Sequence, residues 1–319
     1  MHVKNFLAAI LAGIFLMNAT CAAKSGVIEV ESSVQEIGLH QNVTFAQYFT
    51  WPESRLQMDI FRPAVKGKVP AVIFAPGGWW LTAPKVAGTQ ICYQLAQAGF
   101  VAASIEYRTI GTVNYVESIG DVKAAVRWLR ANADNFNIDK DKIAVIGMSA
   151  GGYLASMMGV TGGEKKFEFG DNLDQSSEVQ AVVDIFGPTD LTKIAADYSK
   201  DKQKLYYSPG APPSLFANGV PCYKGNRGGS ILDTPETARD SNPINHIGKN
   251  TPPFLIMHGN ADTTVSPSQS KIFYDALIKN GVDVDYYVVN GGEHNAAHFY
   301  QPKTFGIIVD FLNRVLKNF

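Results

Sequence analysis

Short apolar runs alternate with amphipathic segments from about residue 55 to the C-terminus. Residues 56–60 alternate apolar and polar side chains, as in a strand with one buried face. Residues 71–75 are apolar without interruption and end at Pro76 and two glycines, which is typical of a strand buried on both faces. The same signals predict further strands at 100–105, 142–146, 181–186, 254–257 and 284–289.

Helical periodicity occupies the segments between these strands. Residues 116–136 are the longest case, because Val122, Val126 and Leu129 fall on one face of a helix there. A shorter apolar stripe ends at Gly99 and predicts another helix. Further helices are predicted from about residue 150, over 267–280 and over 304–317.

The alternation of strands and helices predicts one α/β domain over residues 24–319, with a mostly parallel central sheet and helices on both faces. Residues 188–250 interrupt this rhythm with proline- and glycine-rich stretches that lie among several tyrosines. Connections of this length are usually functional or disordered, and the aromatic content argues against disorder. We therefore expect a cap-like insertion that packs over the strand ends and forms part of a substrate wall.

The N-terminus has the pattern of an export signal. Lys4 supplies a positive end, residues 6–17 are almost entirely apolar, and small residues follow at 19–23. The apolar run is shorter than the ~20 residues of a membrane-spanning helix. We expect residues 1–23 to be a signal peptide, which predicts a secreted or periplasmic protein without stable membrane insertion. A lipid anchor at Cys21 is disfavoured because Asn18 stands where such signals carry an aliphatic residue.

The composition narrows the class of protein. The chain has 319 residues, of which 46% are hydrophobic and 18% charged, as in ordinary globular proteins. Lys and Arg number 28 and Asp and Glu 29, so no basic surplus exists to bind nucleic acid. Removal of the signal would leave Cys92 and Cys222. A single disulfide between them and two buried free thiols both remain open.

Residues 147–152 carry the most informative motif, Gly-Met-Ser-Ala-Gly-Gly. A predicted strand precedes it and a helix follows, which is the context of a nucleophile elbow. A serine on so sharp a turn needs neighbours without bulky side chains two positions away, and Gly147 and Gly151 meet that need. We predict Ser149 as the nucleophile, with the backbone N–H of Ala150 directed at the reacting carbonyl.

A serine nucleophile needs a general base, and the base needs an acid that orients it. In this class of sheet the chain order is Ser, then Asp or Glu, then His. Asp262 follows the predicted strand at 254–257, and His294 follows the strand at 284–289. Both fall at the sheet edge where ligands bind in α/β proteins. We predict Asp262 as the orienting acid and His294 as the general base.

Other residues compete for these roles. Asp190 ends an earlier strand and is the best rival acid. Glu293 adjoins the predicted base but is expected to be a solvated carboxylate, and His258 is expected to brace its loop. His298 lies four residues beyond the predicted base, a spacing that metal ligands can have, but no third ligand of matching spacing is present. His298 is therefore expected to be structural.

A third turn, at residues 76–80, reads Pro-Gly-Gly-Trp-Trp. A glycine-rich loop can direct unobstructed backbone N–H groups at the negative oxygen of a tetrahedral intermediate. We expect the N–H groups of Gly78 and Trp79 to form an oxyanion hole together with that of Ala150.

These stretches together resemble the α/β-hydrolase superfamily, and within it the esterases with a His-Gly-Gly-x-Trp oxyanion loop. The closer resemblance is to the secreted feruloyl and acetylxylan esterase-like group. It extends over about residues 55–318 and rests on 147–152 and on the stretches 105–108, 121–129, 252–259 and 269–270.

The resemblance implies that Ser149, Asp262 and His294 perform acyl transfer, and it places the oxyanion donors in the 76–80 loop and at the elbow. Pro76 departs from the family, because it stands where the family has its loop histidine. Proline lacks the imidazole that would brace the loop, so the aim of the downstream donors is in question.

The sequence thus predicts a secreted serine carboxylesterase that works through an acyl-enzyme without a metal or organic cofactor. The expected substrates are feruloyl or acetyl groups on plant polysaccharides, or similar small esters. A kynurenine-formamidase-like amidase, a prolyl-peptidase-like hydrolase and a catalytically silent adhesion module are the alternatives. The export signal disfavours the first, the short stretch before the first core strand disfavours the second, and the presence of all three triad residues disfavours the third.

Overall fold

The computed structural model describes residues 26–29, 35–49 and 53–317. Contacts divide the chain into two units, Met1–Ser33 and Val34–Phe319. In the first unit only residues 26–29 are described, and they form neither helix nor strand. The predicted signal peptide at 1–23 lies outside the described residues. None of the described helices combines the length and apolar character that a membrane span needs.

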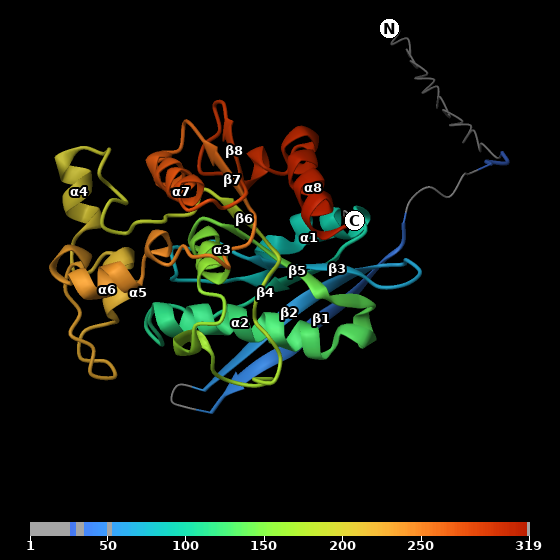
Figure 1. The fold of residues 1–319 in the computed structure, drawn as a ribbon, viewed down its shortest axis with the longest axis horizontal. Helices are drawn as coiled ribbons and strands as arrows, with labels where there is room; N and C mark the ends of the chain where they lie inside the picture. Colours follow the sequence, from blue (N-terminus) through green and yellow to red (C-terminus); the bar gives the residue numbers. More distant parts are fainter. Residues whose placement is uncertain (1–25, 30–34, 50–52, 318–319) are drawn as a thin grey trace, which may run out of the picture. The chain divides into compact units, whose positions relative to one another are not determined.

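The second unit is built on a sheet with eight strands in the described residues (Figure 1). Its spatial order is β1-β2-β4-β3-β5-β6-β7-β8. β1 pairs antiparallel with β2, and β2 pairs antiparallel with β4, whereas all other neighbours are parallel. The strands are β1 (Ile37–Tyr48), β2 (Ser54–Pro63), β3 (Val69–Ala75), β4 (Val101–Ile105), β5 (Ile138–Met148), β6 (Ala181–Ile185), β7 (Phe254–Gly259) and β8 (Val284–Val289).

Helices cover both faces of this sheet. Successive side chains of a strand point to opposite faces, so a strand that is apolar throughout makes both faces apolar, and each face needs a helical layer over it. In β3, Ala71 and Ile73 join one hydrophobic cluster, and Val72 and Phe74 join the other. The first cluster is covered by α2 (Tyr115–Ala131), α3 (Ala150–Val160) and α7 (Ser268–Lys279), and the second by α1 (Thr89–Gln97) and α8 (Pro302–Leu316). The prediction of a mostly parallel sheet between two helical layers is confirmed.

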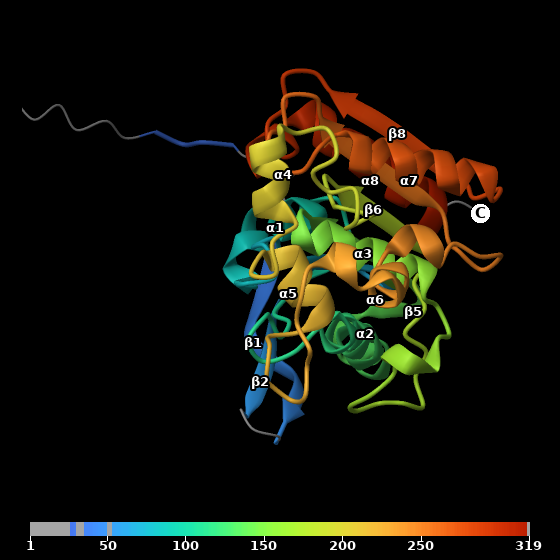
Figure 2. The same ribbon diagram turned by 90° about the vertical axis from the view of Figure 1, so that its left-hand side faces the viewer.

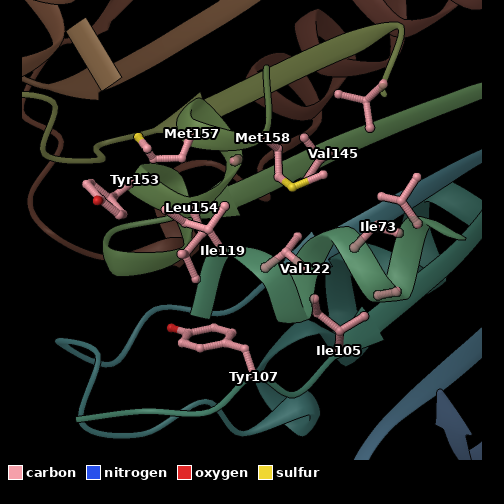
Figure 3. Packing of buried hydrophobic residues seen from close by; sticks show 14 of the residues in the cluster. Ile73, Ile105, Tyr107, Ile119, Val122, Val145, Tyr153, Leu154, Met157 and Met158 are labelled. Carbon is pink, nitrogen blue, oxygen red and sulfur yellow. The ribbon is translucent and has the colours of Figure 1, made fainter. Parts of the chain in front are cut away.

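The cluster beneath α2 and α3 forms the larger core. Figure 3 shows Ile119 of α2 near Leu154 of α3, and Val122 of α2 on the side toward Ile73 and Ile105 of the strands. These side chains are fully buried. Close packing on both faces fixes the strand ends, where the functional loops begin.

Three features differ from the expectation. The sequence missed β1, because its exposed, polar positions and two register shifts break the alternation that signals a strand. The helix predicted over 116–136 ends at Ala131 and is followed by a separate 3₁₀ helix, Ala133–Phe136. Cys92 and Cys222 are both free, and Cys222 is exposed.

The segment 188–250 contains three short α-helices, α4 (Lys200–Tyr206), α5 (Pro212–Asn218) and α6 (Pro235–Asp240). Figure 2 views the molecule from the side of these helices. The Phe216 ring of α5 stacks on Trp80 at 4.5 Å between centroids, and the Tyr206 ring of α4 lies edge-on to Trp79 at 5.5 Å. The segment therefore contacts the loop that follows β3.

The polar face of α2 is buried against the loop that follows α3. Lys123 and Arg127 are both fully buried. Lys123 Nζ lies 2.9 Å from Glu168 Oε1 and donates to the Thr161 carbonyl at 2.8 Å, and Arg127 pairs with the other oxygen of Glu168. Burial alone would raise the pKa of the Glu168 carboxyl, but the Ser177 hydroxyl and the two cations bring this pKa below its usual value.

We expect Glu168→Gln to lower the free energy of unfolding at pH 7 by about 3 kcal/mol, because it leaves two buried cations without their counter-charge. We take the low end of the range for breaking a buried ion pair, because the Glu168 side chain is 21% exposed and partly solvated. A carboxyl whose pKa is lower in the folded than in the unfolded protein stabilises the fold at pH values above its usual pKa, and this stabilisation is lost as the pH falls. The difference between wild type and variant in urea unfolding should therefore shrink below about pH 4.

Asp134→Asn is the matched control, because the Lys68–Asp134 pair lies on the surface and solvent screens it. It should leave the unfolding free energy nearly unchanged at every pH. An equal loss in both variants would contradict a special role for the buried cluster.

Candidate active site

Ser149 occupies the sharp turn between β5 and α3. Its backbone has φ 56° and ψ −121°, which is strained for a residue with a side chain. The turn closes only because its neighbours are glycines: a Cβ on Gly147 would lie 1.9 Å from the Gly151 carbonyl oxygen, and a Cβ on Gly151 would lie 2.0 Å from that of Ala75. The local sequence thus forces the Ser149 side chain out at the carboxyl end of β5.

The structure brings the three predicted triad residues together. Ser149 Oγ lies 2.8 Å from His294 Nε2, and His294 Nδ1 lies 2.7 Å from Asp262 Oδ2. An ionised carboxylate only accepts hydrogen bonds, so Nδ1 carries the proton and donates to Asp262. Nε2 is then the free base, and it accepts the hydrogen bond from the Ser149 hydroxyl.

The surroundings of Asp262 keep it ionised. Burial opposes ionisation, but hydrogen bonds from His258 and His294 and the N–H of Thr264 hold the pKa of Asp262 well below its usual range. The backbone N–H groups of Thr264 and Val265 donate to Oδ1 at 2.8 and 3.0 Å. Both carboxylate oxygens are therefore occupied, which fixes the plane in which the His294 ring is held.

His258 is a second imidazole on the same carboxylate. It is fully buried, and its Nε2 lies 3.2 Å from Asp262 Oδ2 and 3.1 Å from the Val265 carbonyl oxygen. Because both partners are acceptors, Nε2 carries the proton, and Nδ1 accepts from the Ser270 hydroxyl at 2.7 Å. His258 braces the acid loop and does not reach Ser149.

Sequence reasoning missed Phe186, which lies against the base. Its ring centroid is 4.5 Å from that of His294, and its backbone has φ 45°, an unusual value for a bulky residue. Asp184 holds this turn by accepting the Gly187 N–H at 2.8 Å, and burial raises the pKa of the Asp184 carboxyl to about 6. The adjacent Ile185 carbonyl accepts the N–H of Ser149 at 3.0 Å, so one turn contacts both the nucleophile and the base.

The rival residues lie in other interactions. Asp190 accepts from the Asn242 amide at 2.9 Å and pairs with Lys193. Glu293 is exposed, and His298 belongs to a short 3₁₀ helix, Ala296–His298. Within the described ranges, no group of three or more His, Cys, Asp or Glu side chains is placed to hold a metal ion.

The loop after β3 presents backbone donors beside Ser149. No acceptor in the described part of the chain takes a hydrogen bond from the N–H of Gly78, Trp79 or Ala150. Gly78 has φ 141°, and its carbonyl accepts the N–H groups of Leu81 and Thr82 at 2.9 and 3.2 Å. These bonds use the N–H groups of Leu81 and Thr82 and leave those of Gly78 and Trp79 without an acceptor among the described residues.

Tyr107 braces this loop at the position where the family histidine is missing. Its hydroxyl donates to the Pro76 carbonyl at 2.8 Å inside the protein. Burial raises the pKa of the Tyr107 hydroxyl, so the hydroxyl stays protonated and keeps donating. The next residue, Arg108, is fixed by three hydrogen bonds from its guanidinium to the buried Asp121 carboxylate. The only sequence signal for this contact was a tyrosine just past the strand that ends at Ile105.

A family model described as BD-FAE matches residues 58–277. The esterase LipC of Mycobacterium tuberculosis (strain ATCC 25618 / H37Rv) is 32% identical over 209 residues, which cover 65% of this chain and 48% of that protein. A probable isoprenylcysteine alpha-carbonyl methylesterase of Arabidopsis thaliana, ICMEL1, is 24% identical over 265 residues, or 80% of this chain and 52% of that protein. The chain spans about half the length of the curated relatives it matches.

Two solved structures superpose over most of both chains. A truncated form of a carbohydrate esterase from gut microbiota has a TM-score of 0.77 and 26% identity, covering 90% of this chain and 99% of that one. An acetyl ester-xyloside bifunctional hydrolase from Caldicellulosiruptor lactoaceticus has a TM-score of 0.66 and 21% identity, covering 82% and 89%. At that identity the second likeness concerns the fold alone. The predicted α/β-hydrolase fold is confirmed.

Proposed function

The chain belongs to the BD-FAE family, and on that premise we propose that it is a serine carboxylesterase that hydrolyses acyl esters through a covalent acyl-enzyme. The observation that carries the proposal is the unbroken hydrogen-bonded line from Ser149 Oγ through the His294 ring to Asp262. A serine hydroxyl becomes a useful nucleophile only with such a base and orienting acid.

In the proposed reaction, Ser149 Oγ attacks the ester carbonyl carbon while its proton passes to His294 Nε2. The carbonyl oxygen becomes an oxyanion that accepts from the N–H groups of Gly78, Trp79 and Ala150. The tetrahedral intermediate collapses and expels the alcohol, which takes the proton from Nε2. Water then attacks the acyl-enzyme in the same way and releases the carboxylic acid. Asp262 stays ionised and stabilises the imidazolium in both steps.

The names of the relatives support the class of substrate. LipC is named an esterase, and one superposed structure is named a carbohydrate esterase. We propose that this enzyme removes acyl groups, feruloyl or acetyl, from plant polysaccharides or from similar small esters. The N-terminal pattern at residues 1–23 supports export, so the proposed place of action is the periplasm or the medium.

Ser149→Ala should lower kcat on p-nitrophenyl acetate by a factor on the order of 10⁶, because the triad acts as a unit. Adding His294→Ala to this variant should change the residual rate little. Ser176→Ala is a suitable control, since Ser176 is exposed in the loop that follows α3. Substantial turnover by Ser149→Ala, with the fold intact by circular dichroism, would refute the assignment.

Tyr107→Phe removes the hydroxyl that holds the Pro76 carbonyl and leaves a buried acceptor without its donor. We expect kcat on p-nitrophenyl acetate to fall about tenfold with KM nearly unchanged, because an oxyanion hole acts on charge that develops in the transition state. The exposed Tyr93 provides the matched control, Tyr93→Phe. A lower Tm with unchanged kcat would reduce Tyr107 to a packing residue.

A further inference from the structure

The space beside Ser149 is very small. A cavity of about 10 Å³ is lined by Ser149 and Ala150 together with Trp79, Trp80, Pro188, Ile194 and Val265. A volume of about 10–15 Å³ holds one water-sized group. The elbow therefore faces a slit that has room for a methyl group and little more.

The walls of this slit are held from behind. Trp80 is 1% exposed, its ring is stacked on Phe216 with an interplanar angle of 10°, and it meets the Tyr153 ring edge-on. Ile194 is fully buried, and Val265 is fixed through its N–H, which donates to Asp262. Because the surroundings are close-packed, these walls do not yield to a longer group without cost.

The chemistry decides which part of an ester enters the slit. In the tetrahedral intermediate the acyl carbon is bonded to Ser149 Oγ, and its oxyanion faces the N–H groups of the 78–79 loop and Ala150. The leaving alcohol must face His294 Nε2, which returns its proton. The remaining substituent of that carbon is the acyl chain. The slit is lined by the nucleophile Ser149, by two of the oxyanion donors, Trp79 and Ala150, and by four further residues, Trp80, Pro188, Ile194 and Val265, which a short acyl chain would meet.

We propose that the slit is the acyl-binding site and that Trp80, Ile194 and Val265 restrict the acyl group to acetyl. The inference rests on the proposed esterase function and narrows its substrates to acetyl esters. Pro188 and Ile194 belong to the 188–250 segment, so this insertion supplies part of the wall that sets the acyl length.

A second cavity offers the competing site. It has a volume of about 260 Å³, and its lining includes Leu81, Leu205, Tyr206 and Trp79. Trp79 is the only residue that it shares with the slit, and neither Ser149 nor Ala150 lines it. A feruloyl group is far larger than the slit, and this cavity offers it a place, so substrate preference separates the two assignments.

The test compares kcat/KM for p-nitrophenyl acetate, butyrate and hexanoate, with methyl ferulate as the aromatic ester. One surplus methylene in an apolar pocket changes kcat/KM by about tenfold or more. We expect a loss of at least about tenfold from acetate to butyrate, a further loss at hexanoate, and little cleavage of methyl ferulate.

Ile194→Ala should enlarge the slit and raise the butyrate-to-acetate ratio of kcat/KM about tenfold or more. Ile278→Ala is the matched control, because Ile278 is 51% exposed on α7, and it should leave the ratio unchanged. Ile194→Val, a milder deletion, should change the ratio in the same direction if the alanine variant proves unstable by thermal unfolding.

The outcomes are distinct. Wild-type enzyme that cleaves butyrate or ferulate as well as acetate overturns the acetyl limit while leaving the esterase assignment intact. An unchanged ratio in folded Ile194 variants also overturns it. If the wild type cleaves none of these esters, the proposed function fails, and the acetyl limit falls with it.

Discussion

The turn at Ser149 is the constraint on which the rest of the structure depends. A residue with a side chain at φ 56° stores strain, commonly on the order of 1–3 kcal/mol, which surrounding contacts must offset. The Ser149 N–H donates to Ile185 of β6, while Gly151 approaches the Ala75 carbonyl of β3 so closely that no Cβ fits. The turn thus fixes the relative positions of β3, β5, β6 and α3, and these elements in turn hold the nucleophile.

Backbone contacts between two loops also place the base and the acid beside the nucleophile. The loops after β7 and β8 are joined directly: the Ala261 N–H donates to the Gly292 carbonyl at 2.9 Å, and a Cβ on Gly259 would lie 2.1 Å from that same oxygen. Asp262 and His294 follow these contacts within a few residues. The distance between the Asp262 and His294 side chains is therefore set by strand pairing and glycine packing. Because the backbone already places them close together, little conformational entropy is lost when they form their hydrogen bond.

The strands other than β1, the helical layers and the candidate triad could be predicted because each depends on local pattern. Ser149 and Asp262 stand just past the buried apolar strands β5 and β7, and His294 follows β8, a partly exposed strand at the edge of the sheet. The carboxyl ends of these parallel strands meet at one edge. Contacts between distant segments leave no such pattern. The Tyr107 bond that supports Pro76 and the positive φ of Phe186 arise only in the folded chain. The Tyr107 bond supports the loop in which the sequence left the aim of the oxyanion donors open, and Phe186 lies against the base His294.

In the proposed assignment, reaction chemistry and acyl selection are carried by different parts of the chain. The triad comes from strand ends, whereas the slit beside Ser149 is closed by Ile194 of the 188–250 segment and by Trp80. Trp80 also belongs to the oxyanion loop, and Phe216 of α5 supports its ring. This stack couples the two functions, because a change at Phe216 would move a wall of the slit and the backbone that carries the oxyanion donors together. Ile194 belongs to the 188–250 segment and not to the oxyanion loop, so on the proposed assignment we expect acyl length to change there while the oxyanion hole keeps its geometry.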